Sequence, residues 1–376
     1  MKKTLKILLT VAAAFIPSAT FACTSAIVSA SANPSGRPIL WKHRDTSTID
    51  NKVEYIAPSN GNFGYVALYN AADKELKEAW MGMNDAGFAI MNTASYNIKN
   101  DKVPDKQMDK EGIVMAKALQ TCRTVDDFEK LLENYKKPMG VEANFGVIDA
   151  LGNGAYFETN NYSFVKYDLK DAPGGVLVRT NYSHSGRKNE GYGHMREANA
   201  NCLLKSCIES ADVTPEFLTE VVSRTFYHDG KKKDFTMSGD KSLLDDDFIP
   251  RYKSTATIAI EGCRPVESLE IVTPEFVDDQ YIMWTGIGYP PVSEIRAVRC
   301  SDDGVPTELR GSLPTGHSPL GDEAKRKRDD VFKVNKKGKY IDMTKLYNES
   351  GTGYAQKAIE ANKKVYQEEK ARRDAK

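Results

Sequence analysis

Cys23 is the residue whose position in the sequence most clearly points to chemistry. It follows the stretch MKKTLKILLTVAAAFIPSATFA (residues 1–22), which has a basic start, an apolar middle and small residues at its end. These are the three parts of a secretory signal peptide, and Thr20 and Ala22 fit the −3 and −1 positions of its cleavage site. Cleavage after Ala22 leaves 354 residues that begin with Cys23.

A free N-terminal cysteine carries a nucleophile and a base in one residue. An α-amine is partly neutral near pH ~7 to 8, so it can accept the thiol proton directly or through a water molecule. The resulting thiolate attacks a carbonyl carbon and forms a covalent acyl-enzyme. We therefore expect Cys23 to be the nucleophile of an acyl-transfer reaction.

Two other roles for Cys23 stay open at this point. In a bacterial lipoprotein, an N-terminal cysteine carries a lipid on its thiol and anchors the chain to a membrane. Such signals normally place Leu three residues before the cysteine, where this chain has Thr20. The second alternative is that Cys23 merely begins a strand, since free cysteines are usually buried and inert.

Most segments that must position Cys23 are predicted to be strands. Residues 23–30 and the run that starts at Ile39 form a predicted hairpin around the turn at residues 33–36. Further short runs of β-branched and aromatic residues predict strands at residues 53–56, 65–69, 78–83, 88–95, 143–148, 155–158, 163–167, 176–181, 254–260, 269–272 and 281–287.

Helices are predicted between and after these strands. Apolar residues at helical spacing predict helices over residues 111–122 and 124–135, the second capped by Thr124, and a helical section over residues 191–226. This order of elements predicts an α+β chain with two stacked sheets and helices outside them. The charge-rich residues 354–376 predict a solvated terminal helix.

Three short motifs occur in order behind the signal-like stretch: CTS at residues 23–25, LWKHRD at residues 40–45 and MNDAGFAIMN at residues 83–92. Together they resemble the N-terminal-nucleophile hydrolases of the choloylglycine hydrolase and acyl-coenzyme A:6-aminopenicillanate acyltransferase group. The likeness extends to about residue 300. It implies a four-layer αββα sandwich, in which two stacked antiparallel sheets are flanked by helices, and cleavage of a linear amide bond.

The resemblance assigns roles to residues at the end of the predicted hairpin. Asp45 matches the family aspartate that holds the α-amine, although an aspartate there could also cap a turn. Lys42 matches the position of an arginine or glutamine beside the thiol, where a cation favours the thiolate. Arg44 is the competing candidate for this cationic position, because alternation along a strand places it on the same face as Lys42.

The resemblance also assigns the donors that stabilise a tetrahedral intermediate. Asn181 matches the family asparagine whose amide points at the oxyanion. Asn92, or alternatively Asn97, supplies a second donor, and Arg251 matches a late arginine that completes the site. Each has an ordinary alternative, since asparagines end strands and arginines form surface ion pairs.

The sequence contains no metal or cofactor signature. Its five histidines form no His-x-x-x-His pair, and Cys-x-x-Cys pairs, phosphate-binding loops and Gly-x-Ser-x-Gly motifs are absent. We therefore expect neither a metal nor a cofactor. With Cys23 reserved for chemistry, five cysteines remain, which allows at most two disulfides of unassigned pairing.

The charge balance argues against a nucleic-acid partner. Fifty-two Lys and Arg residues match 52 Asp and Glu residues, and the signal cut changes the formal net charge from 0 to −3. The one long apolar run, within residues 7–22, is too short for a membrane span, so no stable membrane insertion is expected.

These observations predict an exported, periplasmic or extracellular enzyme that hydrolyses or transfers the acyl group of a small-molecule amide. The expected parts are a signal peptide (residues 1–22), a catalytic domain (residues 23–320) and a charged helical extension (residues 321–376). The acyl and amine parts of the substrate stay open, as does the oligomeric state, a homo-oligomer included. The aromatic residues expected to form apolar walls of the pocket are Trp41, Tyr96, Trp284 and Tyr289.

Overall fold

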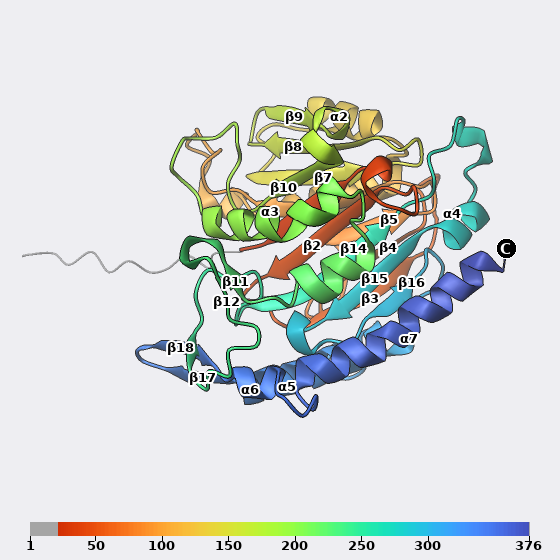
Figure 1. Cartoon of the computed structure of the whole chain (residues 1–376). Helices are drawn as coiled ribbons and strands as arrows, with labels where there is room; N and C mark the ends of the chain where they lie inside the picture. The colour runs from red at the N-terminus through yellow and green to blue at the C-terminus, as the bar shows by residue number, and fades with distance from the viewer. Residues whose placement is uncertain (1–21, 376) are drawn as a thin grey trace, which may run out of the picture.

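The computed structural model of the chain describes residues 22–375, so the predicted signal peptide lies outside the described residues except for Ala22. Two antiparallel sheets are stacked, and helices cover their outer faces (Figure 1). The predicted αββα layering is therefore confirmed.

The first sheet contains the strand that begins one residue after Cys23. Its order is β10-β1-β2-β14-β15-β16. The predicted hairpin is confirmed as β1 and β2, in which Ser25 pairs with Lys42. The strands span β1 (Thr24–Val28), β2 (Ile39–Asp45), β10 (Val176–Arg179), β14 (Ser254–Glu261), β15 (Ile282–Ile287) and β16 (Arg296–Val298).

The second sheet is a seven-stranded meander in simple chain order. The strands predicted between residues 53 and 95 therefore belong to a different sheet from the β1–β2 hairpin. The tight turn between β5 and β6 needs Gly87, whose φ of +82° suits glycine. The strands span β3 (Asn51–Ile56), β4 (Tyr65–Asn70), β5 (Met81–Asn84), β6 (Ala89–Ala94), β7 (Ala143–Ile148), β8 (Gly154–Thr159) and β9 (Phe164–Asp168).

The helices divide between the two outer faces. Helices α1 (Glu111–Thr121) and α2 (Val125–Asn134) pack on the second sheet, and Thr124 caps α2 as predicted. Helix α3 (His194–Glu209) and a π-helical turn (Phe217–Val222) pack on the first sheet. The remaining helices are α4 (Pro274–Gln280), α5 (Pro319–Val331), α6 (Met343–Leu346) and α7 (Tyr354–Asp374).

Strand β2 shows how the layers place polar residues. Leu40 belongs to the core between the two sheets, whereas Trp41 packs in the outer core under α3. Since side chains alternate along a strand, Lys42 and Arg44 follow Leu40 toward the space between the sheets. His43 and Asp45 alternate with them along the strand, and Asp45 is its last residue.

The segment predicted as a strand at residues 269–272 is instead a 3₁₀ helix, Leu269–Ile271. Its start is capped by the Ser268 hydroxyl group, which accepts a hydrogen bond from the amide of Glu270. The chain then enters α4, whose first turn contains Pro274. Local capping therefore outweighs the strand preference of these apolar residues.

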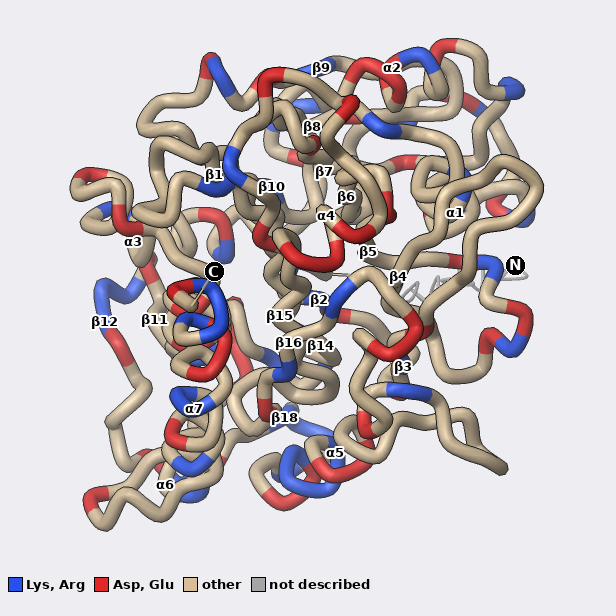
Figure 2. Tube along the Cα trace, turned by 90° about the vertical axis from the view of Figure 1, so that its right-hand side faces the viewer, with Lys and Arg blue, Asp and Glu red and all other residues tan. Residues whose placement is uncertain are grey.

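The C-terminal extension packs on the rest of the chain and is not a solvated appendage. In α7, the ring of Tyr366 lies over Trp284 with 4.6 Å between ring centroids, and Asn362 is fully buried. Figure 2 shows acidic and basic residues interleaved along α5 and α7. The charge-rich composition of residues 354–376 therefore gives no sign of the side chains that α7 packs against the rest of the chain.

Short strands tie the extension to the main body. Strand β13 (Leu243–Leu244) pairs with β18 (Gly338–Ile341), which pairs with β17 (Phe332–Asn335). A separate two-stranded pair joins β11 (Tyr227–His228) and β12 (Lys233–Asp234). All six cysteines are free, and from Ala22 to Ala375 no helix combines the length and the apolar character needed to cross a bilayer.

Candidate active site

Cys23 lies immediately before β1 and opens onto a cavity of about 480 Å³. The cavity is also lined by Lys42, Asp45 and Asn92, three of the residues that the sequence singled out. The Cys23 thiol lies 3.8 Å from the backbone oxygen of Asp45, because the β1–β2 hairpin brings the two ends together. A larger, open hollow of about 780 Å³ between α1 and α2 contains none of the predicted site residues.

The junction between Ala22 and Cys23 is held inside the protein. Ala22 is 7% exposed and Cys23 is 5% exposed. The amide of Ala22 donates to the Asp45 backbone oxygen at 3.3 Å, and Arg251 Nη2 donates to the Ala22 carbonyl at 3.0 Å. The bond that would have to be cut to free the Cys23 amine is therefore buried beside Asp45.

The Asp45 carboxylate is oriented by two neighbours. Its Oδ2 pairs with Arg251 Nη2 at 2.5 Å, and its Oδ1 accepts from the Ser254 hydroxyl at 2.6 Å. His43 Nε2 lies 2.8 Å from the same hydroxyl group. Since Ser254 already donates to Asp45, His43 must donate to Ser254, which requires the Nε2-protonated tautomer. Burial lowers the pKa of His43 to about 4, so the ring is neutral at pH 7.

Lys42 and Arg44 are both buried beside Cys23, but they have different partners. Lys42 Nζ donates to Asn92 Oδ1 at 2.8 Å and to the Trp80 backbone oxygen at 2.9 Å. Arg44 donates to the side-chain oxygens of Asn51 and Asn70, and its guanidinium stacks on Trp80. Lys42 is therefore the cation that contacts another predicted site residue. Burial lowers its pKa to about 8, although a Cys23 thiolate acts in the opposite direction.

Asn181 reaches the site through one intermediary. Its Nδ2 donates to the Ala94 backbone oxygen at 2.9 Å, and Ala94 lines the cavity. Its Oδ1 accepts from Arg196 Nη2 at 2.8 Å, and Arg196 also donates to the Cys23 carbonyl. The alternative donor Asn97 bonds instead to a loop near Ser183, which assigns it a structural role.

The walls of the cavity differ from the predicted ones. Of the four aromatic residues expected, only Tyr96 lines the cavity. Trp41 and Trp284 pack in the outer core of the first sheet, and Tyr289 packs among the C-terminal elements. The structure places Trp80 and Met108 at the cavity instead.

Two glutamates form a further part of the cavity wall. Glu111, at the start of α1, is 6% exposed and accepts a hydrogen bond from the Glu142 amide at 2.9 Å. Burial raises the pKa of Glu111 to about 8 and that of Glu142 to about 7. At neutral pH this wall therefore carries less negative charge than its residue types indicate.

Sequence reasoning missed Arg196, Ser254 and Glu111. Arg196 lies in the first turn of a helix rich in polar residues, where an arginine is usually exposed. Burial lowers its pKa to about 10, and the charge of Arg251 adds to that effect. Ser254 begins β14 and looks like an ordinary strand residue. Ser254 contributes to the site because the pairing of β14 with β2 places it opposite Asp45, and this pairing is not evident from the sequence.

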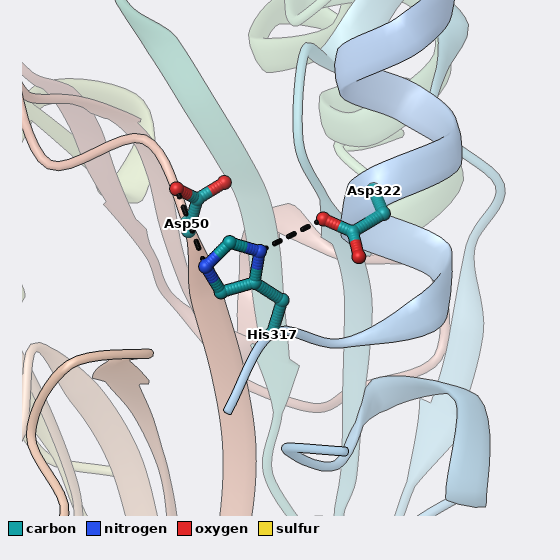
Figure 3. Close-up of side chains that lie close together, drawn as sticks. All are labelled: Asp50, His317 and Asp322. Atoms are coloured by element: carbon teal, nitrogen blue, oxygen red, sulfur yellow. Dashed lines mark hydrogen bonds and ion pairs between the residues drawn. The ribbon is translucent and has the colours of Figure 1, made fainter. Parts of the chain in front are cut away.

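One cluster has the residue types of a metal site, away from Cys23. Asp50, His317 and Asp322 bring their ligand atoms within 4.8 Å of one another (Figure 3). His317 Nδ1 lies 3.0 Å from Asp322, and its Nε2 lies 3.6 Å from Asp50. Lys325 occupies both oxygens of Asp50, at 3.0 and 3.3 Å. Asp50 is therefore already paired with Lys325, and the cluster ties the start of α5 to the residue before β3.

No family model matches the sequence, and no curated protein matches it. Among solved structures, the chain is similar to a mutant of conjugated bile acid hydrolase from Clostridium perfringens, with 10% identity, a TM-score of 0.46 and coverage of 74% of this chain and 92% of that one.

It is also similar to the Caenorhabditis elegans ortholog of N-acylethanolamine-hydrolyzing acid amidase, with 13% identity, a TM-score of 0.41 and coverage of 67% and 97%. For penicillin V acylase from Agrobacterium tumefaciens the values are 10%, 0.39, 74% and 86%. These sequence identities are too low to assign an activity to this chain, so its chemistry has to be inferred from its own residues.

Proposed function

We propose that this chain is an exported cysteine amidohydrolase that cleaves a linear amide bond through an acyl-enzyme on Cys23. The observation that carries the proposal is the buried junction between Ala22 and Cys23. It is held by Arg251 and Asp45 at the edge of the cavity that contains the thiol. Removal of residues 1–22 would place a free α-amine beside both an oriented carboxylate group and its own thiol.

The first step transfers the thiol proton within one residue. The neutral α-amine of Cys23 accepts this proton, and the thiolate attacks the carbonyl carbon of the amide. Asp45 stabilises the ammonium group that forms, because Arg251 and Ser254 hold its carboxylate in place. Lys42 favours the thiolate by its charge, from the same cavity.

The tetrahedral intermediate places negative charge on the former carbonyl oxygen, which needs N–H donors. Asn92 lines the cavity and accepts from Lys42 through Oδ1, so its Nδ2 group is left to donate. Asn181 has a second amide hydrogen beyond the one donated to Ala94. Donors of this kind typically contribute about 10²- to 10³-fold in rate.

The tetrahedral intermediate then collapses to a thioester and a free amine. The C–N bond breaks, the α-ammonium group gives its proton to the leaving amine, and a thioester remains on Cys23. Water attacks the thioester carbon and gives one proton to the α-amine. The C–S bond then breaks, the carboxylic acid leaves, and the α-ammonium group returns its proton to the Cys23 thiolate. An amine that binds in place of this water would receive the acyl group, so the same site supports acyl transfer.

The lipoprotein alternative fits the described residues less well. Cys23 is 5% exposed, and Thr24 and Ser25 are fully buried in β1. A lipid on the Cys23 thiol would therefore have to lie in the cavity.

Two measurements on the exported protein test the proposal. Mass spectrometry of the mature N-terminus is expected to find unmodified Cys23, whereas a diacylglyceryl mass would contradict it. The mature protein is then assayed on bile-acid conjugates, N-acyl amino acids, phenylacetyl amides and β-alanyl amides. Failure to cleave any amide, with Cys23 free and the fold intact, would refute amide hydrolysis.

The nucleophile is tested with a matched pair of cysteine variants. Cys23→Ala is expected to lower turnover by at least about 10³-fold without changing the thermal midpoint by more than a few degrees. Cys202→Ser is the control, because Cys202 is exposed on α3 and has no part in the cavity. Turnover that survives in Cys23→Ala would mean that another group is the nucleophile.

A further inference from the structure

Arg196 is a buried cation that links the nucleophile to the predicted oxyanion asparagine. It is 1% exposed. Its Nη1 donates to the Cys23 carbonyl oxygen at 2.5 Å and to Thr24 Oγ1 at 3.1 Å. Its Nη2 donates to Asn181 Oδ1 at 2.8 Å. One guanidinium group therefore spans the start of β1 and the segment that follows β10.

Within the described part of the chain, Arg196 has no carboxylate partner, unlike two other arginines buried to a similar degree. Arg179 pairs with Glu158 at 2.7 Å, and Arg224 pairs with Glu220 at 3.2 Å. From residue 22 to residue 375, Arg196 has only neutral oxygens as hydrogen-bond acceptors, and its Nε is buried without a partner. Burying the Arg196 guanidinium group without a carboxylate partner costs folding free energy, so we expect this residue to have a role besides packing.

The contact with Arg196 fixes the orientation of the Asn181 amide. An arginine only donates, so the atom facing it must be the amide oxygen. Nδ2 therefore points to the other side, where one of its hydrogens is donated to the Ala94 backbone oxygen. Asn181 itself is fully buried, and its neighbour Ala94 lines the cavity, so the second hydrogen of Nδ2 lies one residue behind the cavity wall. An amide turned by 180° would present its oxygen there and repel an oxyanion.

We propose that Arg196 is a positioning residue of the active site. It holds the Asn181 amide nitrogen as a donor and fixes the Cys23 backbone relative to it, so that the sulfur and the oxyanion donor keep their separation. The inference rests on the proposed function, since the donor matters only where an oxyanion forms. Because a donor of this kind acts mainly in the transition state, its loss lowers kcat more than it raises KM.

A double-mutant cycle on the mature protein tests this inference with an amide that the wild type cleaves. Asn181→Ala is expected to lower kcat by about 10²-fold. Arg196→Met is expected to lower kcat about 10- to 100-fold with KM unchanged within about threefold. In the Asn181→Ala background, Arg196→Met should add less than about threefold, because the group that it positions is gone. Full multiplication of the two effects would refute the inference.

Arg224→Met is the control for the loss of a buried arginine. The hydrogen bonds of the Arg224 side chain go to Thr219, Glu220 and Ser293, so it has no part in the cavity. This variant should lower the thermal midpoint but keep kcat within about threefold at temperatures where it is folded. Equal losses of kcat in Arg224→Met and Arg196→Met would mean that Arg196 acts only through stability.

A crystal structure of Arg196→Met gives a readout that needs no activity. The Asn181 side chain is expected to turn, and an unchanged amide that still donates to Ala94 would overturn the inference. If this variant does not fold, Arg196→Lys takes its place, since one ammonium group cannot span both acceptors. If the wild type cleaves no amide but Asn181 turns, the proposed function fails while the positioning by Arg196 stands.

Discussion

Lys42 is expected to set the alkaline limit of activity. Burial lowers its pKa from 10.5 to about 8. Its ammonium group is therefore about nine-tenths protonated at pH 7 and about half protonated at pH 8. The proposed mechanism needs this charge beside the thiolate, so kcat/KM should fall as the pH rises through about 8.

The size of the effect follows from the contacts of Lys42. Its ammonium group donates to Asn92 and to the Trp80 backbone, and it lines the cavity with Cys23. Interactions of this charged kind contribute about 1.5 to 3 kcal/mol. Since about 1.4 kcal/mol is tenfold in rate, Lys42→Met should lower kcat/KM about 10- to 150-fold at pH 7. Lys42→Arg keeps the charge throughout the accessible pH range, so its profile should lose the alkaline fall near pH 8.

The assay is the pH dependence of kcat/KM from pH 5 to pH 10 for the wild type and both variants. Lys99→Met is the matched control, because Lys99 also lines the cavity but has its ion pair with Asp101. This control should keep the alkaline limit of the wild type. A fall near pH 8 that persists in Lys42→Arg, or a loss below about threefold in Lys42→Met, would refute the reasoning.

Three predictions concern stability. Burial raises the pKa of Glu111 from 4.5 to about 8, so its contribution to stability is fully present below pH 4.5 and is lost progressively as the pH rises toward 8. The wild type should therefore lose about 4 kcal/mol between pH 5 and pH 9 relative to Glu111→Gln, measured by urea unfolding. Asn362→Ala should cost about 2 to 4 kcal/mol in the same assay, because Asn362 bonds to both Ile295 and Glu220. Gly87→Ala should cost about 1 to 3 kcal/mol, because its φ is +82° and a Cβ would lie 3.0 Å from Ala150.

Each of these three stability predictions would be contradicted by a specific result. The same pH dependence in the wild type and in Glu111→Gln would mean that Glu111 is ionised in the folded protein at pH 7. Lys364→Ala, on the exposed face of the same helix as Asn362, should change stability by less than about 0.5 kcal/mol. An equal cost for both α7 variants would show that helix propensity, not the buried contacts, decides the result. An unchanged midpoint for Gly87→Ala would mean that the turn adapts without strain.

The hairpin and its consequences could be predicted from the sequence because they depend on local patterns. The turn at residues 33–36 sets the pairing of β1 with β2, and this pairing brings Cys23 to Asp45. Helices α1 and α2 follow from apolar spacing and the Thr124 cap. In these cases neighbours in sequence decide the outcome, so a single sequence suffices.

What could not be predicted depends on contacts between distant segments. Trp41 and Trp284 were expected at the pocket, but both faces of the first sheet are covered by protein, so aromatic residues in its strands do not mark a cavity. Arg196 looks like a surface residue until α3 is packed on β1 and β10. Helix α7 shows the same limit, since a buried Asn362 in a charged helix gives no periodic signal.

The burial of the junction between Ala22 and Cys23 has a consequence for the timing of maturation. A peptidase acting in trans cannot reach this bond once Arg251 and Asp45 enclose it. On the proposed mechanism, maturation therefore precedes folding, and a copy that folds early stays latent. Such a copy would have no amidase activity inside the producing cell, and no inhibitor protein would be needed. On the proposed mechanism, protein made from a chain that starts at Cys23 is therefore expected to be active, whereas a precursor that is treated with a peptidase after folding is expected to stay inactive.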